Sequence, residues 1–190
     1  MPMPVDVSKW ETHYAAGRDF RPVLDEEMTA FDEAVPESLG RRALDIGCGT
    51  GGFARFMRTR DFTVLGLDCS DNAVSRATAA SEHLQNISFS KWNAELDSWQ
   101  SIPTADLISC RLSYAFIRDK KNFLRNVFEN LAPGGIFYVM TPMSQDLPEE
   151  RKATGISSEE AAELCEGWAS VKKHQLDAHH VRYALTRGAD

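Results

Sequence analysis

The sequence predicts an α/β protein in which a mainly parallel sheet carries helices on both faces. Two observations support this prediction. Short apolar runs alternate with longer amphipathic segments through the middle of the chain, and this alternation is typical of repeated strand–helix units. A glycine-rich turn also joins the first apolar run to a helical segment, and glycine supplies the backbone freedom that such a corner requires. The expected strands of these units cover residues 42–46, 63–68, 87–91, 105–110 and 135–141, and the helices between them cover 51–60, 71–84 and 119–130.

Two further helices are expected before the first strand, at residues 8–16 and 25–34. Trp10 and Tyr14 are four residues apart, so they share one face of the first helix. Pro36 marks the end of the second helix, because the residue before a proline disfavours the helical conformation. These helices lie outside the alternating units, and we expect residues 1–40 to form a helical lid.

The C-terminal part of the chain predicts a helix followed by a hairpin. Ser157 and Glu160 have the spacing of a capping box, which indicates a helix over residues 157–166. Residues 169–176 and 180–186 then form two apolar–polar segments joined by a tight turn. A closing hairpin makes the last strand of the sheet antiparallel to the others.

Length and charge limit the function classes. The chain has 190 residues and a formal net charge of −7, so one domain over 1–190, with an α/β core over 41–190, is expected. An acidic chain without a basic stripe does not favour nucleic acid as a partner. No apolar run approaches the roughly 20 residues that span a bilayer, and the N-terminus lacks the pattern of a signal peptide. We therefore expect a cytoplasmic protein that does not contact membranes.

The four cysteines do not indicate a metal site. None of them shows the C-x-x-C spacing of a zinc ligand pair. Cys48, Cys69 and Cys110 fall at the ends of neighbouring predicted strands, where free cysteine commonly acts as a small apolar residue. No metal is expected.

The glycine turn and the end of the second strand point to a nucleoside ligand. Gly47, Gly49 and Gly51 follow the first strand directly, and they allow a ligand to approach the backbone closely. The second strand ends in Asp68, an acid placed to accept hydrogen bonds from two ribose hydroxyls. An adenosine-containing ligand is therefore expected across the carboxyl ends of two adjacent strands.

Asp45 helps to distinguish between the possible nucleoside ligands. Gly47, Gly49 and Gly52 also satisfy the dinucleotide pattern G-x-G-x-x-G, which by itself is a weak signal. A pyrophosphate at a helix N-terminus needs a positive environment, whereas Asp45 places a carboxylate just before the turn. A carboxylate suits S-adenosylmethionine, which carries an ammonium and a sulfonium. A nicotinamide oxidoreductase is accordingly disfavoured.

Four segments in this order resemble the class I S-adenosylmethionine-dependent methyltransferases. The matching segments are DIGCGTG at 45–51, GLDCS at 66–70, ADLISC at 105–110 and LAPGGIF at 131–137. The resemblance implies a three-layer α/β/α Rossmann-like sandwich with a seven-stranded sheet in the order 3-2-1-4-5-7-6. It also implies S-adenosyl-L-methionine as the cofactor and S-adenosyl-L-homocysteine as the product.

The resemblance assigns cofactor contacts along the strand ends. It implies them for Tyr14, Arg21, Asp45, Gly47, Cys48, Gly49, Gly51, Asp68, Cys69, Ser70, Asn93, Ala94, Glu95, Cys110 and Arg111. Asn93 stands where the family often has an aspartate near the adenine amino group; either it or Glu95 is the partner of the base, and Asn93 is otherwise a turn residue. Arg111 holds the cofactor carboxylate, holds an anionic acceptor, or points away into an ion pair.

The acceptor is the part of the reaction about which the sequence says least. His13 and Tyr114 are candidates to face it, with His13 as the base that an alcohol or phenol would need. His174, His179 and His180 are expected to be solvated on the terminal hairpin. Only residues 1–40, 111–118 and 142–156 are available to build a second pocket. A small acceptor with an oxygen or nitrogen nucleophile, free or presented by a partner or carrier, is therefore expected.

Other functions stay open at this point. A methyltransferase acting on RNA or protein and a non-catalytic cofactor-binding module both retain the same glycine turn and acids. The chain is expected to be a monomer or a homodimer.

Overall fold

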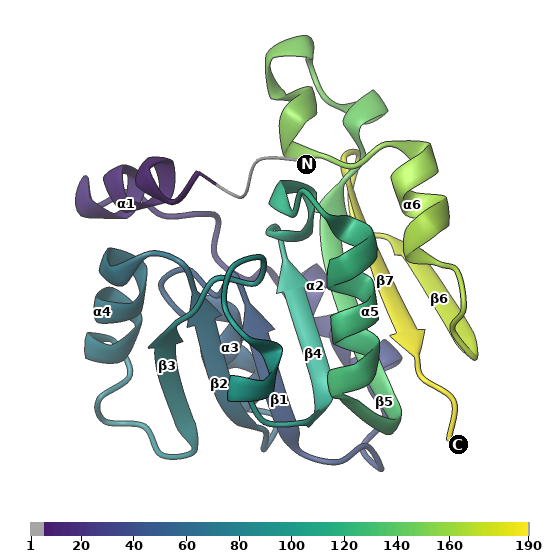
Figure 1. Ribbon diagram of the computed structural model, residues 1–190, viewed down its shortest axis with the longest axis horizontal. Helices are drawn as coiled ribbons and strands as arrows, with labels where there is room; N and C mark the ends of the chain where they lie inside the picture. Colours follow the sequence, from purple (N-terminus) through teal and green to yellow (C-terminus); the bar gives the residue numbers. More distant parts are fainter. Residues whose placement is uncertain (1–5, 190) are drawn as a thin grey trace.

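The computed structural model describes residues 6–189, and over these residues it confirms the expected strand order β3-β2-β1-β4-β5-β7-β6 (Figure 1). The strands are β1 (Arg42–Ile46), β2 (Thr63–Asp68), β3 (Ile87–Lys91), β4 (Ala105–Arg111), β5 (Leu131–Pro142), β6 (Ser170–Gln175) and β7 (His180–Thr186). Strands β1 to β5 pair in parallel, and β7 runs antiparallel to both of its neighbours, β5 and β6. The order reverses between β1 and β4, which places the topological switch point beside the glycine turn.

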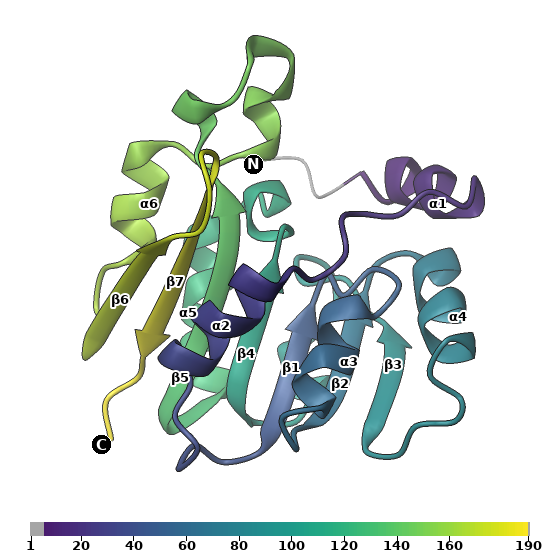
Figure 2. The same ribbon diagram turned by 180° about the vertical axis from the view of Figure 1, so that it is seen from behind.

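Helices cover both faces of the sheet. The helices are α1 (Val7–Ala15), α2 (Asp25–Ala34), α3 (Gly52–Arg58), α4 (Asp71–Ala79), α5 (Lys120–Asn130) and α6 (Ser158–Leu164), with short 3-10 turns η1 (Trp99–Ser101), η2 (Tyr114–Phe116), η3 (Ser144–Asp146) and η4 (Glu149–Thr154). Figure 1 shows α5 and α6 in front of the sheet, and Figure 2 shows α2 and α3 on the opposite face. None of the helices in this described part of the chain is long and apolar enough to cross a membrane.

Each face has its own apolar core. On one face, Phe123 and Val127 of α5 pack against strand residues such as Ile108, and all three side chains are fully buried. On the other face, Phe31 of α2 and Phe53 of α3 pack with Leu107, Tyr138 and further strand residues. Residues of one strand alternate between the two cores because successive side chains point to opposite faces.

Two elements differ from the sequence prediction by four or more residues at one end, whereas the other bounds agree within two residues. Helix α4 ends at Ala79 rather than at residue 84, and the chain continues in turns closed by a bond from Leu84 N to Ser81 O (2.8 Å). Strand β5 begins at Leu131, four residues early, because Leu131 pairs with Ala105 before a shift in register. Residues 133–135, at the expected start of this strand, are therefore an irregularity inside it, with Gly134 at φ +74°.

The predicted N-terminal lid divides into two parts with different surroundings. Helix α2 is a layer of the sandwich, since its Phe31 is buried in the core beneath it. Helix α1 instead lies over the N-terminus of α4 (Figures 1 and 2). Glu11 accepts hydrogen bonds there from Asn72 N (3.2 Å) and Ser70 Oγ (3.0 Å). The linker between α1 and α2, residues 16–24, crosses the strand ends.

Candidate functional site

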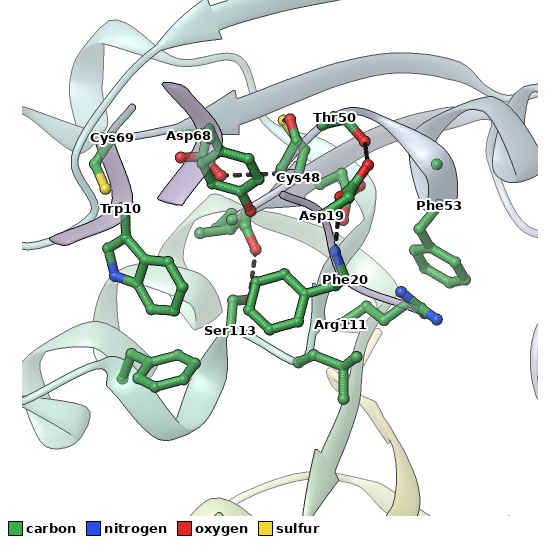
Figure 3. A pocket seen from close by; sticks show the side chains of 18 of the residues that line it. Trp10, Asp19, Phe20, Cys48, Thr50, Phe53, Asp68, Cys69, Arg111 and Ser113 are labelled. Atoms are coloured by element: carbon green, nitrogen blue, oxygen red, sulfur yellow. Dashed lines mark hydrogen bonds between the residues drawn. The ribbon is translucent and has the colours of Figure 1, made fainter. Parts of the chain in front are cut away.

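A cavity of about 460 Å³ lies at the carboxyl ends of β1, β2 and β4, between these ends and the 16–24 linker. In the view of Figure 3, Asp68 and Cys48 lie above Trp10, Phe20 and Ser113. In open α/β sheets, the switch point at the carboxyl ends is where ligands bind. The position of the cavity therefore agrees with the sequence prediction.

The glycine turn packs closely against the end of β2 and against the loop after β4. Gly47 N donates to Leu67 O (2.7 Å), and its φ is +72°. A Cβ on Gly47 would stand 2.4 Å from the Cβ of Ser113, whose hydroxyl donates to Ile46 O (2.7 Å). Any side chain here would collide with the loop after β4, so glycine brings the backbone itself to the cavity wall.

Asp68 lies at the end of β2 with its carboxylate anchored by backbone groups. Gly49 N donates to Oδ2 (2.9 Å) and Ser70 N donates to Oδ1 (3.0 Å). Burial raises the pKa of Asp68, while these two backbone bonds act in the opposite direction. A carboxylate offers about four acceptor positions, so one remains on each oxygen. That arrangement suits a diol.

Asp45 has an oxygen without a partner. Ser109 Oγ donates to Oδ1 (2.8 Å), whereas Oδ2 is buried and accepts no hydrogen bond. Burial raises the pKa of Asp45 to about 6, although the Ser109 hydrogen bond and the charge of Arg111 lower it. Because buried acceptors are normally satisfied, the free oxygen beside the glycine turn indicates a position for a ligand donor.

The loop after β3 forms a further corner of the cavity. Asn93 Oδ1 accepts from Glu95 N (2.9 Å), which is the turn geometry that the sequence left as one alternative. Its Nδ2 is buried without a partner and so remains available to a ligand acceptor. The Glu95 carboxylate accepts from the backbone N–H groups of Arg118 and Asp119 (2.8 and 3.0 Å), which ties this loop to the start of α5.

Arg111 adopts the third of its predicted alternatives, the ion pair. Its Nε lies 2.6 Å from Glu27 Oε2, and its Nη2 donates to Pro22 O (2.9 Å). Arg21 joins the same carboxylate at 2.8 Å and also reaches Asp177 at 3.1 Å. The two arginines therefore fasten the linker to α2 and to the hairpin, although both also line the cavity.

The hairpin histidines require a partial correction. His180 was expected to be solvated, but its Nδ1 lies 2.8 Å from Asp177 Oδ1 and its side chain is only 12% exposed. Burial by itself raises the pKa of Asp177. The hydrogen bonds from His179 N, His180 and Arg21 outweigh burial, so the pKa of Asp177 is lowered overall. The β6–β7 turn reaches the linker because the sheet order brings β7 next to β5. His179 and His174 are exposed, as expected.

Three residues assigned to the cofactor do not line the cavity. Cys110 is fully buried in the core beneath it. Ser70 is the N-cap of α4, where its side chain accepts from Ala73 N. Gly51 is the N-cap of α3 and faces Phe89, which a Cβ would approach to 2.7 Å. The other assigned residues line the cavity: Tyr14, Arg21, Asp45, Gly47, Cys48, Gly49, Asp68, Cys69, Asn93, Ala94, Glu95 and Arg111.

Neither candidate for the acceptor side lines the cavity. Tyr114 of η2 is fully buried, and its ring packs near Phe123 and Phe137. Tyr114 is therefore a core residue. His13 lies on α1 and stacks on Phe20 at 5.3 Å. Burial and the nearby charge of Arg18 lower the pKa of His13. The structure gives no support to either residue as a catalytic group.

The cavity is also lined by side chains that the sequence did not single out. Phe20, Leu112 and Phe116 line the cavity, and Trp10, which the sequence also allowed as core packing, lines it with them. Three of these four lie in irregular segments, where no periodicity marks a functional face. The third stretch expected to build an acceptor pocket, 142–156, forms η3 and η4 and lines none of it.

The thiols and acids of residues 6–189 form no group of three or more that could hold a metal ion. All four cysteines are free. Burial raises the pKa of Cys69 to about 12 and that of Cys48 well above its usual value. These thiols stay protonated and act as small apolar side chains of the cavity.

Comparison with known proteins identifies the family. A sequence profile for the methyltransferase domain matches residues 16–186. The trans-aconitate 2-methyltransferase of Deinococcus radiodurans is 30% identical over 132 residues, which are 68% of this chain and 49% of that protein. The ubiquinone biosynthesis O-methyltransferase of Acinetobacter baumannii is 26% identical over 136 residues, covering 70% and 57%. The chain thus spans about half the length of the curated relatives that it matches.

Solved structures show the same fold. The N-methyltransferase NodS from Bradyrhizobium japonicum, in complex with S-adenosyl-l-homocysteine, superposes with a TM-score of 0.72 at 16% identity, over 95% of this chain and 97% of that one. A phosphoethanolamine N-methyltransferase from Haemonchus contortus gives a TM-score of 0.71 at 17% identity, covering 96% and 58%. The profile match over most of the chain, together with this fold, shows that the chain belongs to the methyltransferase domain family.

Proposed function

We propose that this domain uses S-adenosyl-L-methionine to methylate a small-molecule acceptor. The supporting observation is the pair of acids on one cavity: Asp45, with a buried oxygen that has no partner, and Asp68, with one acceptor position left on each oxygen. An ammonium donor fits the first, and a ribose diol fits the second. The curated relatives, named for trans-aconitate and for ubiquinone biosynthesis, support a small acceptor.

The residues of this chain would hold and orient the cofactor. Asp68 would accept from the ribose, the Gly47 backbone would lie against the ligand, and Asp45 would accept from the amino group. Asn93 Nδ2 would donate to a ring nitrogen of the base. When bound, the cofactor supplies an electrophilic methyl group on a sulfonium. Alignment of an acceptor with that methyl contributes on the order of 7–11 kcal/mol to catalysis, so the protein needs few catalytic groups of its own.

The decisive experiment is calorimetry with S-adenosylhomocysteine, NADH and NADPH. We expect the homocysteine nucleoside to bind and the two dinucleotides not to bind. Asp68→Ala removes both ribose acceptors and is expected to weaken nucleoside binding at least 30-fold. Asp32→Asn is the matched control, because Asp32 pairs with Arg60 on the surface away from the cavity. Unchanged affinity of the Asp68 variant, or preferential binding of NADH, would refute the assignment.

Two alternatives are tested by the next assay. A domain that binds the nucleoside but transfers no methyl group to any acceptor would be a binding module. Transfer to RNA or protein, but not to small molecules, would place the acceptor in the other class. Release of S-adenosylhomocysteine over a mixed panel of acceptors distinguishes these outcomes.

A further inference from the structure

Three aromatic side chains form a continuous wall on one side of the cavity. Trp10 of α1 lies 4.8 Å from Phe116 of η2 between ring centroids, and 5.7 Å from Phe20 of the linker. All three line the cavity, and in the view of Figure 3 Trp10 and Phe20 lie below Asp68. Phe20 is 41% exposed, although it is a large apolar side chain. We call this set the aromatic wall.

Three polar side chains that line the cavity together with the aromatic wall are engaged within the protein. Ser113 Oγ donates to Ile46 O, and the Asp19 carboxylate accepts from the Thr50 hydroxyl. The Arg111 guanidinium is held by Glu27 and the linker carbonyls. Lys9 and His13 contact the rings of the wall but do not line the cavity: Lys9 Nζ lies 5.6 Å from the Trp10 ring centroid, and His13 stacks on Phe20. A ligand that touches the wall would therefore be recognised by shape and apolar contact rather than by charge.

The cavity also lacks a group suited to remove a proton from the acceptor. Among the described residues that line it there is no histidine. Its four acids have other roles. Asp45 and Asp68 face the cofactor positions, Glu95 accepts from two backbone N–H groups, and Asp19 accepts from the Thr50 hydroxyl and from Phe20 N. Tyr14 and Cys69 keep their protons, because burial raises the pKa of both groups. An acceptor must then ionise without help from the protein.

We propose that the acceptor is a planar aromatic molecule with an acidic hydroxyl or thiol, stacked on the aromatic wall. This inference rests on the proposed function and names its acceptor class. The acceptor releases its proton to water before transfer. Its anionic oxygen or sulfur then forms a bond to the methyl carbon while the carbon–sulfonium bond breaks, which leaves an aryl methyl ether or thioether and the neutral S-adenosylhomocysteine thioether.

Binding of two matched probes tests the wall. Titrations of 2-naphthol and of its saturated analogue decahydro-2-naphthol use protein saturated with S-adenosylhomocysteine. Since aromatic pairs gain more than their buried area alone, we expect the planar probe to bind at least five times more tightly. Equal binding, or tighter binding of the saturated probe, would overturn the proposal.

Variants of the wall residues test whether the preference for the planar probe arises at the aromatic wall. Phe116→Leu and Phe20→Leu keep an apolar side chain but remove the ring. Each is expected to bring the ratio of the two probe affinities close to one. Because Phe20 is exposed, Phe20→Leu is not expected to impair folding. Phe128→Leu is the control, because Phe128 is also partly exposed but lies on α5 outside the cavity. A ratio that the wall variants leave unchanged contradicts the assignment.

Turnover tests the missing base. Methylation of 4-nitrophenol and of 4-cyanophenol, whose pKa values both lie above that of Asp45, is followed against pH at a saturating cofactor concentration by the release of S-adenosylhomocysteine. The pH at half-maximal rate should differ between the two phenols as their own pKa values do. A midpoint common to both, or nucleoside binding without methylation of either phenol, would overturn this part. Failure to bind the nucleoside at all is a failure of the proposed function instead, and the naphthol ratio measured on the free protein then still judges the wall.

Discussion

Replacement of Asp45 by asparagine should raise the stability relative to the wild type as the pH rises, and should weaken ligand binding. Burial raises the pKa of Asp45 to about 6, against an ordinary value of 3.8. Between these two values the folded protein holds a proton that the unfolded chain has lost. The free energy of unfolding of the wild type therefore falls as the pH rises through this window, because above it the folded state contains an ionised, buried carboxylate.

The magnitude follows from the same two pKa values. From pH 5 to pH 8 this group alone lowers the free energy of unfolding by about 1.4 kcal/mol, and nearly all of that change is complete by pH 7. Asp45→Asn cannot ionise, so it lacks this loss. We expect the variant to gain about 1.4 kcal/mol relative to the wild type between pH 5 and pH 8.

Urea unfolding of both proteins at the two pH values measures this gain. Any fixed cost of the amide, such as an unpaired N–H beside Ser109, cancels because only the change with pH is compared. Asp32→Asn, whose parent residue pairs with Arg60 outside the cavity, is measured in the same way as the surface control. A relative stability of Asp45→Asn that is the same at pH 5 and pH 8 would refute a raised pKa for this buried acid.

The same variant should also weaken ligand binding. At pH 8 the ionised carboxylate accepts from the ammonium of S-adenosylhomocysteine, so Asp45→Asn should bind this ligand at least tenfold more weakly. The wild-type affinity should itself fall as the pH drops through about 6, where Asp45 gains its proton. Calorimetry at pH 5, 6 and 8 checks both statements.

Three further changes are expected to have distinct effects. Asp68→Asn keeps an oxygen acceptor but loses the charge, and should weaken S-adenosylhomocysteine binding less than Asp68→Ala does, as calorimetry on both variants will show. Gly47→Ala forces a side chain to φ +72° and to 2.4 Å from Ser113; it should lower the melting temperature and abolish nucleoside binding, whereas Gly188→Ala, in open space, should do neither. Glu27→Gln removes the buried charge shared by Arg21 and Arg111 and should cost roughly 3 kcal/mol in urea unfolding, with a loss below about 0.5 kcal/mol showing that the cluster is not a structural clamp.

The sequence by itself determined the position of most strands and several of the residues that line the cavity at the strand ends. Strand bounds such as 63–68 and 87–91 were predicted without error, because periodicity and turn residues are local properties. Asp45, Gly47 and Asp68 could be found for the same reason. Each follows a strand directly, and the carboxyl ends of neighbouring parallel strands must meet at one edge of the sheet.

Only the tertiary structure decided the acceptor side and the roles of several charged residues. Arg111 had three possible roles in the sequence, and the one it adopts depends on Glu27, which is 84 positions away and buried on helix α2. Tyr114 and Phe116 are two residues apart, yet one is core and the other lines the cavity. Irregular segments carry no period that tells these fates apart, since their side-chain directions are set by long-range contacts rather than by the local backbone.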